Sequence, residues 1–284
     1  MQGCPYCHSN QFIKDGRYFR KNDSRYVQRF QCKECFKKFS VATTELECGH
    51  KKRRINYQVF KLYCSGVSFN RMAWLLGVHR LTIKRKILYL AKKCNRDHKK
   101  LIQNRVFSEI QIDDLITTEH TKLKPLSVTN IYASDQRLIL KSQVSQIPAF
   151  GLLAKISRAK YGYRESHLRK GLDKAFSEVE PYIKKDALFK SDMHQLYPEY
   201  IFKYFPKAEL QTFKSEKGCV SGQGELKKQK YDPIFSINQF NAKLRADLNR
   251  LFRRTWCTTK DPRMLQCHLD IYRHFYNLRS LKII

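Results

Sequence analysis

Three kinds of hydrophobic pattern follow one another along the chain. Residues 11–20 and 25–32 alternate aromatic or β-branched residues with polar ones, which predicts two strands joined by a turn at residues 21–24. Between residues 52 and 100, apolar residues recur at helical spacing. After residue 105, short alternating runs return among helical ones, so the pattern predicts a multidomain α+β protein. We expect three domains, at residues 1–48, 52–100 and 105–284.

The middle segment contains three short helical blocks. The first ends at Ser65 and Gly66, and the second runs from Ser68, which we expect to be an N-cap, to Gly77. The third block is strongly basic. A helix, a glycine-containing turn and a basic helix are typical of a helix-turn-helix DNA-binding domain, with the third block as recognition helix. The alternative is a small helical bundle with a solvated charged face.

The charge of this segment is one-sided. Residues 51–100 contain 15 Lys and Arg but a single acid, Asp97. In the third block, basic residues surround an apolar face formed by Ile83, Ile87 and Leu90. We predict that the DNA-binding residues of this block are Arg80, Lys84, Arg85 and Lys86.

The C-terminal segment begins with strands and continues with helices. The predicted strands lie at residues 108–113, 125–132, 137–144, 187–192 and 208–213. The predicted helices lie at residues 148–185 and 234–255, and a basic mobile loop lies at residues 217–230. Three strands, a helix, two strands and a helix is the order of the RNase H-like fold, an α/β domain with a mixed sheet and flanking helices.

The composition narrows the function classes. The chain has 284 residues, with 56 Lys and Arg against 25 Asp and Glu, a formal net charge of +31. A folded chain this basic is expected to bind a polyanion, with nucleic acid as first candidate and an anionic membrane surface as second. No apolar run approaches the roughly 18–20 residues needed to cross a bilayer, and the N-terminus lacks a signal-peptide pattern. We expect a cytoplasmic, nucleoid-associated protein without a membrane partner.

Four of the ten cysteines form two CxxC pairs. Cys4 and Cys7 make one tight turn, and Cys32 and Cys35 make the other. Two such turns direct four thiolates at one centre, and four sulfur ligands with no open position favour a structural Zn²⁺. With the predicted hairpin between them, the turns predict a zinc ribbon. A redox CxxC is the alternative, although a redox motif needs only one pair.

Two apolar runs end in carboxylates. One ends at Asp192, and the other at Asp113 and Asp114. Acids at the ends of two strands can meet in space and hold a divalent cation, and oxygen ligands suit Mg²⁺ or Mn²⁺ and phosphate-ester chemistry. The alternative is a set of ordinary surface aspartates.

The order of these motifs resembles bacterial insertion-sequence transposases of the DDE type, which carry an N-terminal zinc ribbon and a helix-turn-helix. The matching residues are the two CxxC turns and residues 66–68, 76–78, 112–114, 191–197, 244–245 and 250–255. Together they span nearly the whole chain. The resemblance implies a DNA transposase that binds the ends of an insertion sequence and catalyses metal-dependent DNA cleavage and strand transfer. It also implies a homodimer or higher oligomer on double-stranded DNA.

The resemblance further implies that Asp113 and Asp192 are catalytic acids that hold Mg²⁺ or Mn²⁺ for two-metal phosphoryl transfer. Asp114 is the register alternative, since a shift of one residue points a side chain to the opposite face of a strand. The third position departs from the family, because Asn238 stands where such transposases have a glutamate. An amide oxygen can bind Mg²⁺ but brings no negative charge.

The helix expected at residues 234–255 carries further candidates. Asp247 is a substitute for the third ligand, and Glu225, in the preceding loop, is another. The basic residues of this helix that we expect to hold DNA phosphates are Arg245, Arg250, Arg253 and Arg254. The alternative is that these arginines form only a solvated basic face and do not contact DNA. Trp256 and Cys257, just past the helix, are expected in the core.

Two other functions fit the same residues. A non-catalytic DNA-binding regulator, or a decayed transposase, would share the N-terminal third, and the missing glutamate favours it. A structure-specific nuclease would use the same fold without strand joining. Loss of metal-dependent cleavage in Asp192→Ala, with DNA binding retained, would separate either enzyme from the regulator.

Overall fold

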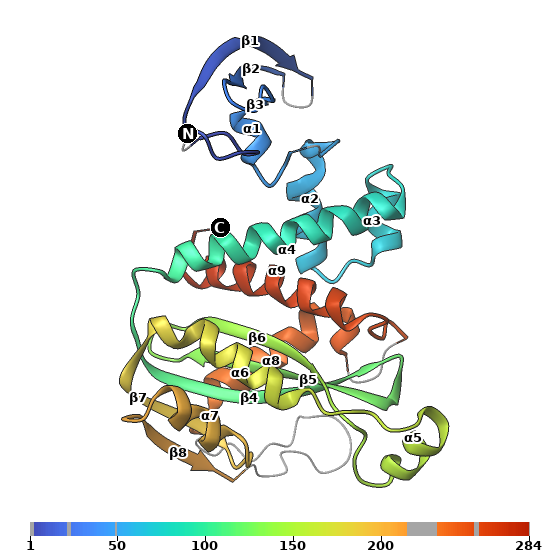
Figure 1. Cartoon of the computed structure of the whole chain (residues 1–284). Helices are drawn as coiled ribbons and strands as arrows, with labels where there is room; N and C mark the ends of the chain where they lie inside the picture. The colour runs from blue at the N-terminus through green and yellow to red at the C-terminus, as the bar shows by residue number, and fades with distance from the viewer. Residues whose placement is uncertain (1–2, 22–23, 49, 215–231, 253–255, 284) are drawn as a thin grey trace. The chain divides into compact units, whose positions relative to one another are not determined.

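The computed structural model describes residues 3–21, 24–48, 50–214, 232–252 and 256–283 (Figure 1). The chain divides into two compact units. The first comprises Met1–Leu62 and Ser68–Lys93, and the second comprises Tyr63–Val67 and Cys94–Ile284. None of the described helices is long and apolar enough to cross a membrane.

The first unit begins with an antiparallel sheet of order β1-β2-β3. Its strands are β1 (Phe12–Arg20), β2 (Arg25–Cys32) and β3 (Lys38–Ser40). The β1–β2 hairpin confirms the two strands predicted there. The ring of Phe12 packs 5.5 Å from the rings of Phe30 and Phe39, centroid to centroid. So small an apolar cluster cannot stabilise a sheet by itself, which leaves a role for the cysteines beside it.

Helices make up the rest of the first unit. After the short α1 (Val41–Thr44) and η1 (Arg53–Ile55), the helices are α2 (Asn56–Cys64), α3 (Phe69–Leu75) and α4 (Arg80–Ile102). All three fall on the predicted blocks. Ser68 is the N-cap of α3, because its hydroxyl accepts from the backbone N–H of Arg71 at 3.4 Å. The turn before α4 has Gly77 in the left-handed conformation, with φ of 58°.

Helix α4 is longer than the predicted third block. Residues Leu90, Cys94, His98 and Ile102 are all buried and recur every four residues, so one stripe of α4 stays covered to its end. The stripe includes a histidine, which a pattern based on apolar residues does not count. The residues of α4 from Cys94 onward belong to the second unit.

The second unit is built on a five-stranded mixed sheet of order β6-β5-β4-β7-β8 (Figure 1). Its strands are β4 (Phe107–Glu119), β5 (Thr121–Ala133), β6 (Leu138–Gln146), β7 (Ile183–Asp192) and β8 (Glu209–Phe213). Strand β5 is antiparallel to both β4 and β6. Strand β7 is parallel to β4, and β8 is parallel to β7. Strands β4, β5 and β6 confirm the three strands predicted at residues 108–113, 125–132 and 137–144.

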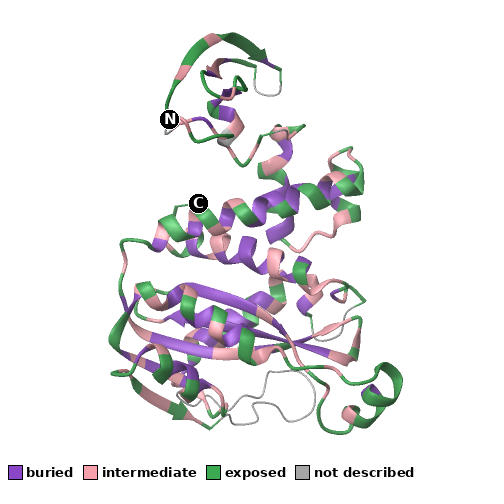
Figure 2. Ribbon diagram, viewed as in Figure 1, coloured by how far each residue is buried: buried purple, intermediate pink, exposed green. Residues whose placement is uncertain are grey.

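Helices cover both faces of this sheet, whose strands are largely buried (Figure 2). The helical elements are α5 (Leu153–Tyr161), α6 (Leu168–Val179), η2 (Glu180–Tyr182), α7 (Tyr197–Tyr204), α8 (Phe235–Asp247), η4 (Asn249–Leu251) and α9 (Pro262–Ser280). On one face, Ile112 packs in a core with side chains of α6 and α7. On the other face, Leu115 packs in a core with side chains of α8 and α9. Helix α6 approaches β6 so closely that a Cβ on Gly171 would lie 1.9 Å from Ser145 Oγ.

Several predicted bounds were wrong. The run ending at Asp113 is not a whole strand, because β4 continues to Glu119 through its pairing with β5. The predicted helix 148–185 is α5, α6 and η2, and β7 already begins at Ile183. The predicted helix 234–255 leaves the helical conformation at its C-cap, Leu248, so Arg245 and Arg250 do not lie on one helix.

The end of the chain differs most from prediction. Helix α9 was not predicted, although its residues Leu265, Leu269 and Tyr272 are buried in the core. Trp256 is fully exposed and Cys257 is exposed, so neither is a core residue. Because α8 ends nine residues before Trp256, that side chain is not carried along its apolar stripe.

Side chains of α9 satisfy the free edge of β6. The amide of Asn277 accepts from the N–H of Ile139 and donates to its C=O, both at 2.9 Å. The amide of Gln266 accepts from Val144 N–H and donates to Ser142 C=O, both at 2.8 Å. These amides replace the hydrogen bonds that another strand would make, and so they protect an edge that could otherwise pair with another chain.

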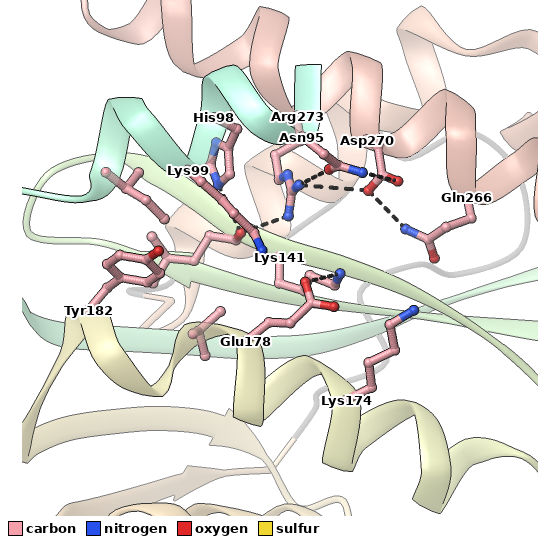
Figure 3. Close-up of a pocket in the computed structure, with 13 residues that line it drawn as sticks. Asn95, His98, Lys99, Lys141, Lys174, Glu178, Tyr182, Gln266, Asp270 and Arg273 are labelled. Atoms are coloured by element: carbon pink, nitrogen blue, oxygen red, sulfur yellow. Dashed lines mark hydrogen bonds and ion pairs between the residues drawn. The ribbon is translucent and has the colours of Figure 1, made fainter. Parts of the chain in front are cut away.

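A cavity of about 190 Å³ lies between β6, α6, α9 and the last turns of α4 (Figure 3). Two ion pairs line it, from Lys141 to Glu178 at 2.7 Å and from Arg273 to Asp270 at 3.7 Å. Asn95 donates to Asp270 at 2.9 Å, so both acids of the lining are engaged. None of the predicted site residues that the structure describes lines this cavity.

Candidate functional site

The first candidate site is formed by the four cysteines of the first unit. The sulfur atoms of Cys4, Cys7, Cys32 and Cys35 all lie within 4.8 Å of one another. Each CxxC turn is followed by a residue in the left-handed conformation, His8 with φ of 62° and Phe36 with φ of 57°. The two halves of the cluster therefore share one local backbone geometry.

The cluster fits a tetrahedral metal. Zinc–sulfur bonds of about 2.3 Å place neighbouring sulfurs of a tetrahedron roughly 3.8 Å apart. The sulfur of Cys4 lies 3.6 Å from that of Cys35, and the sulfur of Cys7 lies 3.5 Å from that of Cys32. Backbone N–H groups of Cys35 and Glu34 lower the pKa of Cys32 to about 7, which favours the thiolate that a metal requires. The arrangement is consistent with a structural Zn²⁺ site, as predicted.

The second candidate site is the start of α4. Arg80, Lys84 and Arg85 are exposed, so they are available to phosphates. Lys86 is different, because it is 3% exposed and its Nζ donates to the main-chain oxygen of Lys51 at 2.7 Å. Its position next to Ile87 turns it inward, and burial lowers its pKa. The prediction of a DNA contact for Lys86 is therefore corrected to a structural role.

The third candidate site contains the two predicted acids of the sheet. Ile112 of β4 pairs with Ser191 of the parallel β7, so the next residues, Asp113 and Asp192, come level with each other. Parallel pairing also directs these two side chains to the same face of the sheet. That face is the one covered by α8, since Ile112 points into the opposite core. Two acids 79 residues apart thus lie on neighbouring strands.

Asp113 is held by an asparagine of α8. The amide of Asn241 donates to Asp113 Oδ2 at 2.6 Å. Burial and the negative charge of Asp192 raise the pKa of Asp113 to about 6. A carboxyl in this state carries an unfavourable charge at neutral pH, and a bound cation would relieve that cost.

A buried chain of hydrogen bonds fixes Asn241 in turn. Asn130, opposite Asp113 on β5, donates to Asn241 Oδ1 at 2.7 Å. Ser142 on β6 donates to Asn130 Oδ1 at 2.6 Å. The search of the sequence for site residues missed Asn130 and Ser142. Polar residues inside predicted strands were the only available signal.

Asp192 lies at the last position of β7. Its Oδ1 accepts from the backbone N–H of His194 at 3.2 Å. Burial raises the pKa of Asp192, and the charge of Asp114 adds to the shift. Three carboxyl groups therefore influence one another at this point of the sheet.

Asp114 points to the opposite face of β4 from Asp113. Its Oδ1 is buried without a hydrogen-bond partner among the described residues. Burial, and then the charge of Asp114, raise the pKa of the buried Tyr197 on α7. Asp114 thus belongs to the side of the sheet that α6 and α7 cover.

Asn238 lies one turn before Asn241 on α8 but has a different partner. Its amide donates to Asp232 Oδ2 at 2.8 Å. The side-chain oxygen of Gln111, two residues before Asp113, accepts from Ile237 N–H at 3.0 Å. This hydrogen bond fixes the start of α8 against β4. The structure therefore brings Asn241, rather than Asn238, into contact with a predicted catalytic acid, Asp113.

The alternative third ligands lie elsewhere. Asp247 accepts from the hydroxyl of Tyr272 on α9 at 2.5 Å, and it raises the pKa of that tyrosine together with burial. Glu225 lies outside the described residues. Within the part of the chain that the structure describes, the only metal-compatible group of three or more His, Cys, Asp and Glu is the cysteine cluster.

The predicted arginines of the C-terminal region separate. Arg245, on α8, donates to the main-chain oxygens of Ile116 and Leu251 at 3.5 and 3.4 Å. Arg250 lies on η4, where its Nε is buried and its charge lowers the pKa of His268 after burial. Arg253 and Arg254 lie outside the described residues.

Comparison of the chain with models of known protein families and with curated proteins finds no match. The α+β organisation, the four-cysteine cluster and the five-stranded mixed sheet are therefore the features on which a function must be argued.

Proposed function

We propose that this protein is a DNA transposase that binds the ends of an insertion sequence and catalyses metal-dependent cleavage and strand transfer. The observation that carries the proposal is the pair of acids, Asp113 and Asp192, level with each other on neighbouring parallel strands. The strand order supports it, because three antiparallel strands followed by two parallel ones is the order expected of an RNase H-like sheet. Both acids lie on the face that α8 covers, as an RNase H-like active site requires.

Asp113 and Asp192 would hold the divalent cations. The amide oxygen of Asn238, on α8, would be a further ligand. Bound there, Mg²⁺ or Mn²⁺ supplies Lewis acidity that activates an attacking oxygen and stabilises a leaving one. The chain itself orients the acids: Asn241 donates to Asp113, and the N–H of His194 donates to Asp192. Although the pKa of Asp113 is raised to about 6, this carboxyl is still ionised above neutral pH and so is available as a ligand.

The first unit supplies the DNA-binding part of the proposal. A zinc ribbon built on the cysteine cluster and a helix-turn-helix ending in α4 would recognise the element ends. Arg80, Lys84 and Arg85 are the exposed cations of the proposed recognition helix. Because the resemblance to such transposases implies oligomers on paired DNA ends, a homodimer or larger assembly belongs to the same proposal.

The test uses the DNA that flanks the gene as substrate, with Mg²⁺ or Mn²⁺. Native protein should cut 3′ ends and join them to target DNA, and Asp192→Ala should bind the same DNA without cutting. Cleavage without joining would favour a structure-specific nuclease.

A DNA-binding regulator is the second candidate, and one observation favours it. No third acid joins Asp113 and Asp192 closely enough to complete a metal site among the described residues. If native protein and Asp192→Ala bind the ends alike and neither cuts with either metal, this second candidate replaces the first. Asn238→Glu would then test whether a third carboxylate restores cleavage.

A further inference from the structure

The segment between β6 and α6 exposes many large apolar side chains. We call residues 147–164 the arm; it contains α5 (Figure 1). The exposed fractions are 94% for Leu152, 80% for Tyr163, 64% for Phe150 and 55% for Ile156. Apolar side chains gathered in this way on one surface segment mark an interaction site.

The arm is anchored at its base to the β4–β5 hairpin. Ser157 Oγ donates to the main-chain oxygen of Leu123 at 2.7 Å. The guanidinium of Arg164 pairs with Glu119 at 2.9 Å. Because Ser157 is buried against the hairpin while Ile156 is exposed, one side of α5 is fixed and another is left for a partner.

The charge of the arm indicates the kind of partner. No Asp or Glu occurs between residues 136 and 164. Lys155, Arg158 and Lys160 are exposed and make no ion pair with the described residues. A second copy would bring another chain of net charge +31 against this basic surface, which repulsion disfavours. A polyanion with apolar surface of its own fits better.

We propose that the arm binds double-stranded DNA. The lysines contact phosphates, and Leu152 and Ile156 lie against the sugar walls of the minor groove, where apolar side chains are often inserted. The binding itself needs only the charge and exposure of the arm, whereas its place on the DNA rests on the proposed function.

The position of the arm on the DNA follows from β4, which carries Asp113 and ends at the residue that pairs with the arm. Glu119, which pairs with Arg164 of the arm, lies six positions after Asp113 on β4, a span of about 20 Å. At 3.4 Å for each base pair, that span corresponds to about six base pairs. The arm should therefore contact the duplex about six base pairs from the phosphodiester that is cut.

The charge of the arm is tested with the full-length chain. Lys155→Gln with Lys160→Gln should lower the affinity for the flanking DNA and reduce the slope of log K against log salt by about two. The matched control is Lys184→Gln with Lys207→Gln, two exposed lysines at the opposite end of the parallel strands, which should leave the slope unchanged.

The apolar part is tested separately. Leu152→Ser should weaken binding by up to about tenfold without changing the salt slope, because it removes buried apolar area and no charge. Val106→Ser is the control, since Val106 is also exposed, at 57%, but lies outside the arm. All six substitutions in these four variants are at exposed positions, and circular dichroism would verify the fold.

Photocrosslinking decides the position. The photoreactive p-benzoylphenylalanine at position 152 should crosslink to nucleotides about six base pairs from the cut. If position 152 crosslinks to DNA and the salt effect occurs but the native protein does not cut DNA, binding of DNA by the arm stands and the transposase proposal fails.

Three outcomes would overturn the arm proposal. The first is an unchanged salt slope together with no crosslink. The second is a loss of binding to phosphatidylserine vesicles in the arm variants while DNA binding stays native, which would assign the arm to a membrane surface. The third is a change of sedimentation coefficient with unchanged DNA binding, which would assign it to a second copy.

Discussion

Asn241 is the residue on which the geometry of the acid pair depends. Its amide donates to Asp113 and accepts from Asn130, so both of its polar atoms are engaged in a buried position. An aspartate here would add a fourth carboxyl, and an apolar residue would leave two partners unsatisfied. An amide is the group that orients Asp113 without adding charge.

We predict that Asn241→Ala lowers the free energy of unfolding by about 1–3 kcal/mol, because a buried Asn130 amide loses its acceptor. Metal-dependent cleavage should fall as well, since Asp113 loses its donor. Urea unfolding and a cleavage assay measure the two effects. Gln239→Ala, at an exposed position of the same helix, is the control and should change neither.

A double-mutant cycle that combines Asn241→Ala with Asn130→Ala tests the chain of hydrogen bonds. The double variant should be less destabilised than the sum of the single variants, with a coupling of at least about 0.5 kcal/mol. Strict additivity would mean that the two asparagines act independently.

Asp113 and Asp114 should respond in opposite ways to neutralisation. Asp113→Asn should abolish metal-dependent cleavage, because Asp113 lies on the face of Asp192. It should also raise the free energy of unfolding in a chelator at pH 8 by about 1–3 kcal/mol, since a carboxyl with a pKa raised to about 6 costs energy when ionised.

Asp114→Asn is the matched control for the register. It leaves Asp113, Asp192 and Asn241 in place, so cleavage should persist. Cleavage by Asp113→Asn, or its loss only in Asp114→Asn, would show that the opposite face of β4 carries the chemistry.

At this scale, the sequence predicted the acids better than their surroundings. The alternation of β4 already separated Asp113 from Asp114, because neighbouring strand residues face opposite sides. Asn130 and Ser142 could not be predicted, since their role depends on which strands lie side by side. The amide that contacts Asp113 is one turn from the predicted Asn238 for the same reason.

At the scale of the elements, helix α9 has an unexpected role, because its side chains bind the edge strand of the sheet. It places Asn277 and Gln266 along β6, so that amide groups replace a sixth strand. Arg273 adds a hydrogen bond from its guanidinium to the main-chain oxygen of Leu140 at 2.9 Å. The C-terminal helix thus closes the edge that the five strands leave open.

We predict that Asn277→Ala destabilises the protein by about 2–4 kcal/mol, because two buried backbone groups of Ile139 lose their partners. The free energy of unfolding in urea gives the magnitude. Arg279→Ala, at an exposed position on the same helix, should cost less than about 0.5 kcal/mol. Equal effects of the two substitutions would rule out the edge role.

Metal removal should affect a different element. The native protein should contain one zinc ion per chain, bound by the cysteine cluster. Cys7→Ser should lower the zinc content and unfold the β1–β3 sheet, because the apolar cluster beside the sheet consists of three phenylalanines and cysteines of the site itself. Cys48→Ser, at an exposed cysteine outside the cluster, should retain the zinc; atomic absorption and circular dichroism distinguish the two variants.

The strands and the first helices could be predicted because their buried positions are mostly apolar. Helix α9 could not, since polar residues such as His268, Asp270 and Asn277 are buried on it. An analysis that counts only apolar residues predicts that such a segment is exposed at the surface. The end of α8 at Asp247 was likewise hidden, because the apolar residues Leu248 and Leu251 continue the helical spacing beyond the helix.

For the whole molecule, the balance of buried ionisable groups sets how stability changes with pH. Burial lowers the pKa values of His98 and His268 well below 6.5. Both rings contact a main-chain oxygen through Nε2, at 3.1 and 2.9 Å, so the neutral ring satisfies its environment. The Nδ1 atom of His268 is buried without a partner among the described residues, and a proton placed there would have no acceptor.

These two histidines should make the protein less stable as the pH falls below 6.5. The unfolded chain takes up protons at its ordinary histidine pKa while the folded chain does not, so each histidine lowers the free energy of unfolding by roughly 1.4 kcal/mol per pH unit. Asp113 acts in the opposite direction between pH 6 and about 4, because the folded state holds its proton more tightly than the unfolded state.

The two effects can be separated by urea unfolding at pH 7.5, 6.5 and 5.5. His268→Gln retains a donor for the oxygen of Tyr63 and should reduce the loss of stability between pH 6.5 and 5.5. Asp113→Asn should increase that loss, because the compensating proton uptake is removed. If His268→Gln leaves the pH dependence unchanged, the buried histidine cannot be the group whose protonation opposes folding. If Asp113→Asn leaves it unchanged, the carboxyl is not held at a raised pKa by burial and by Asp192.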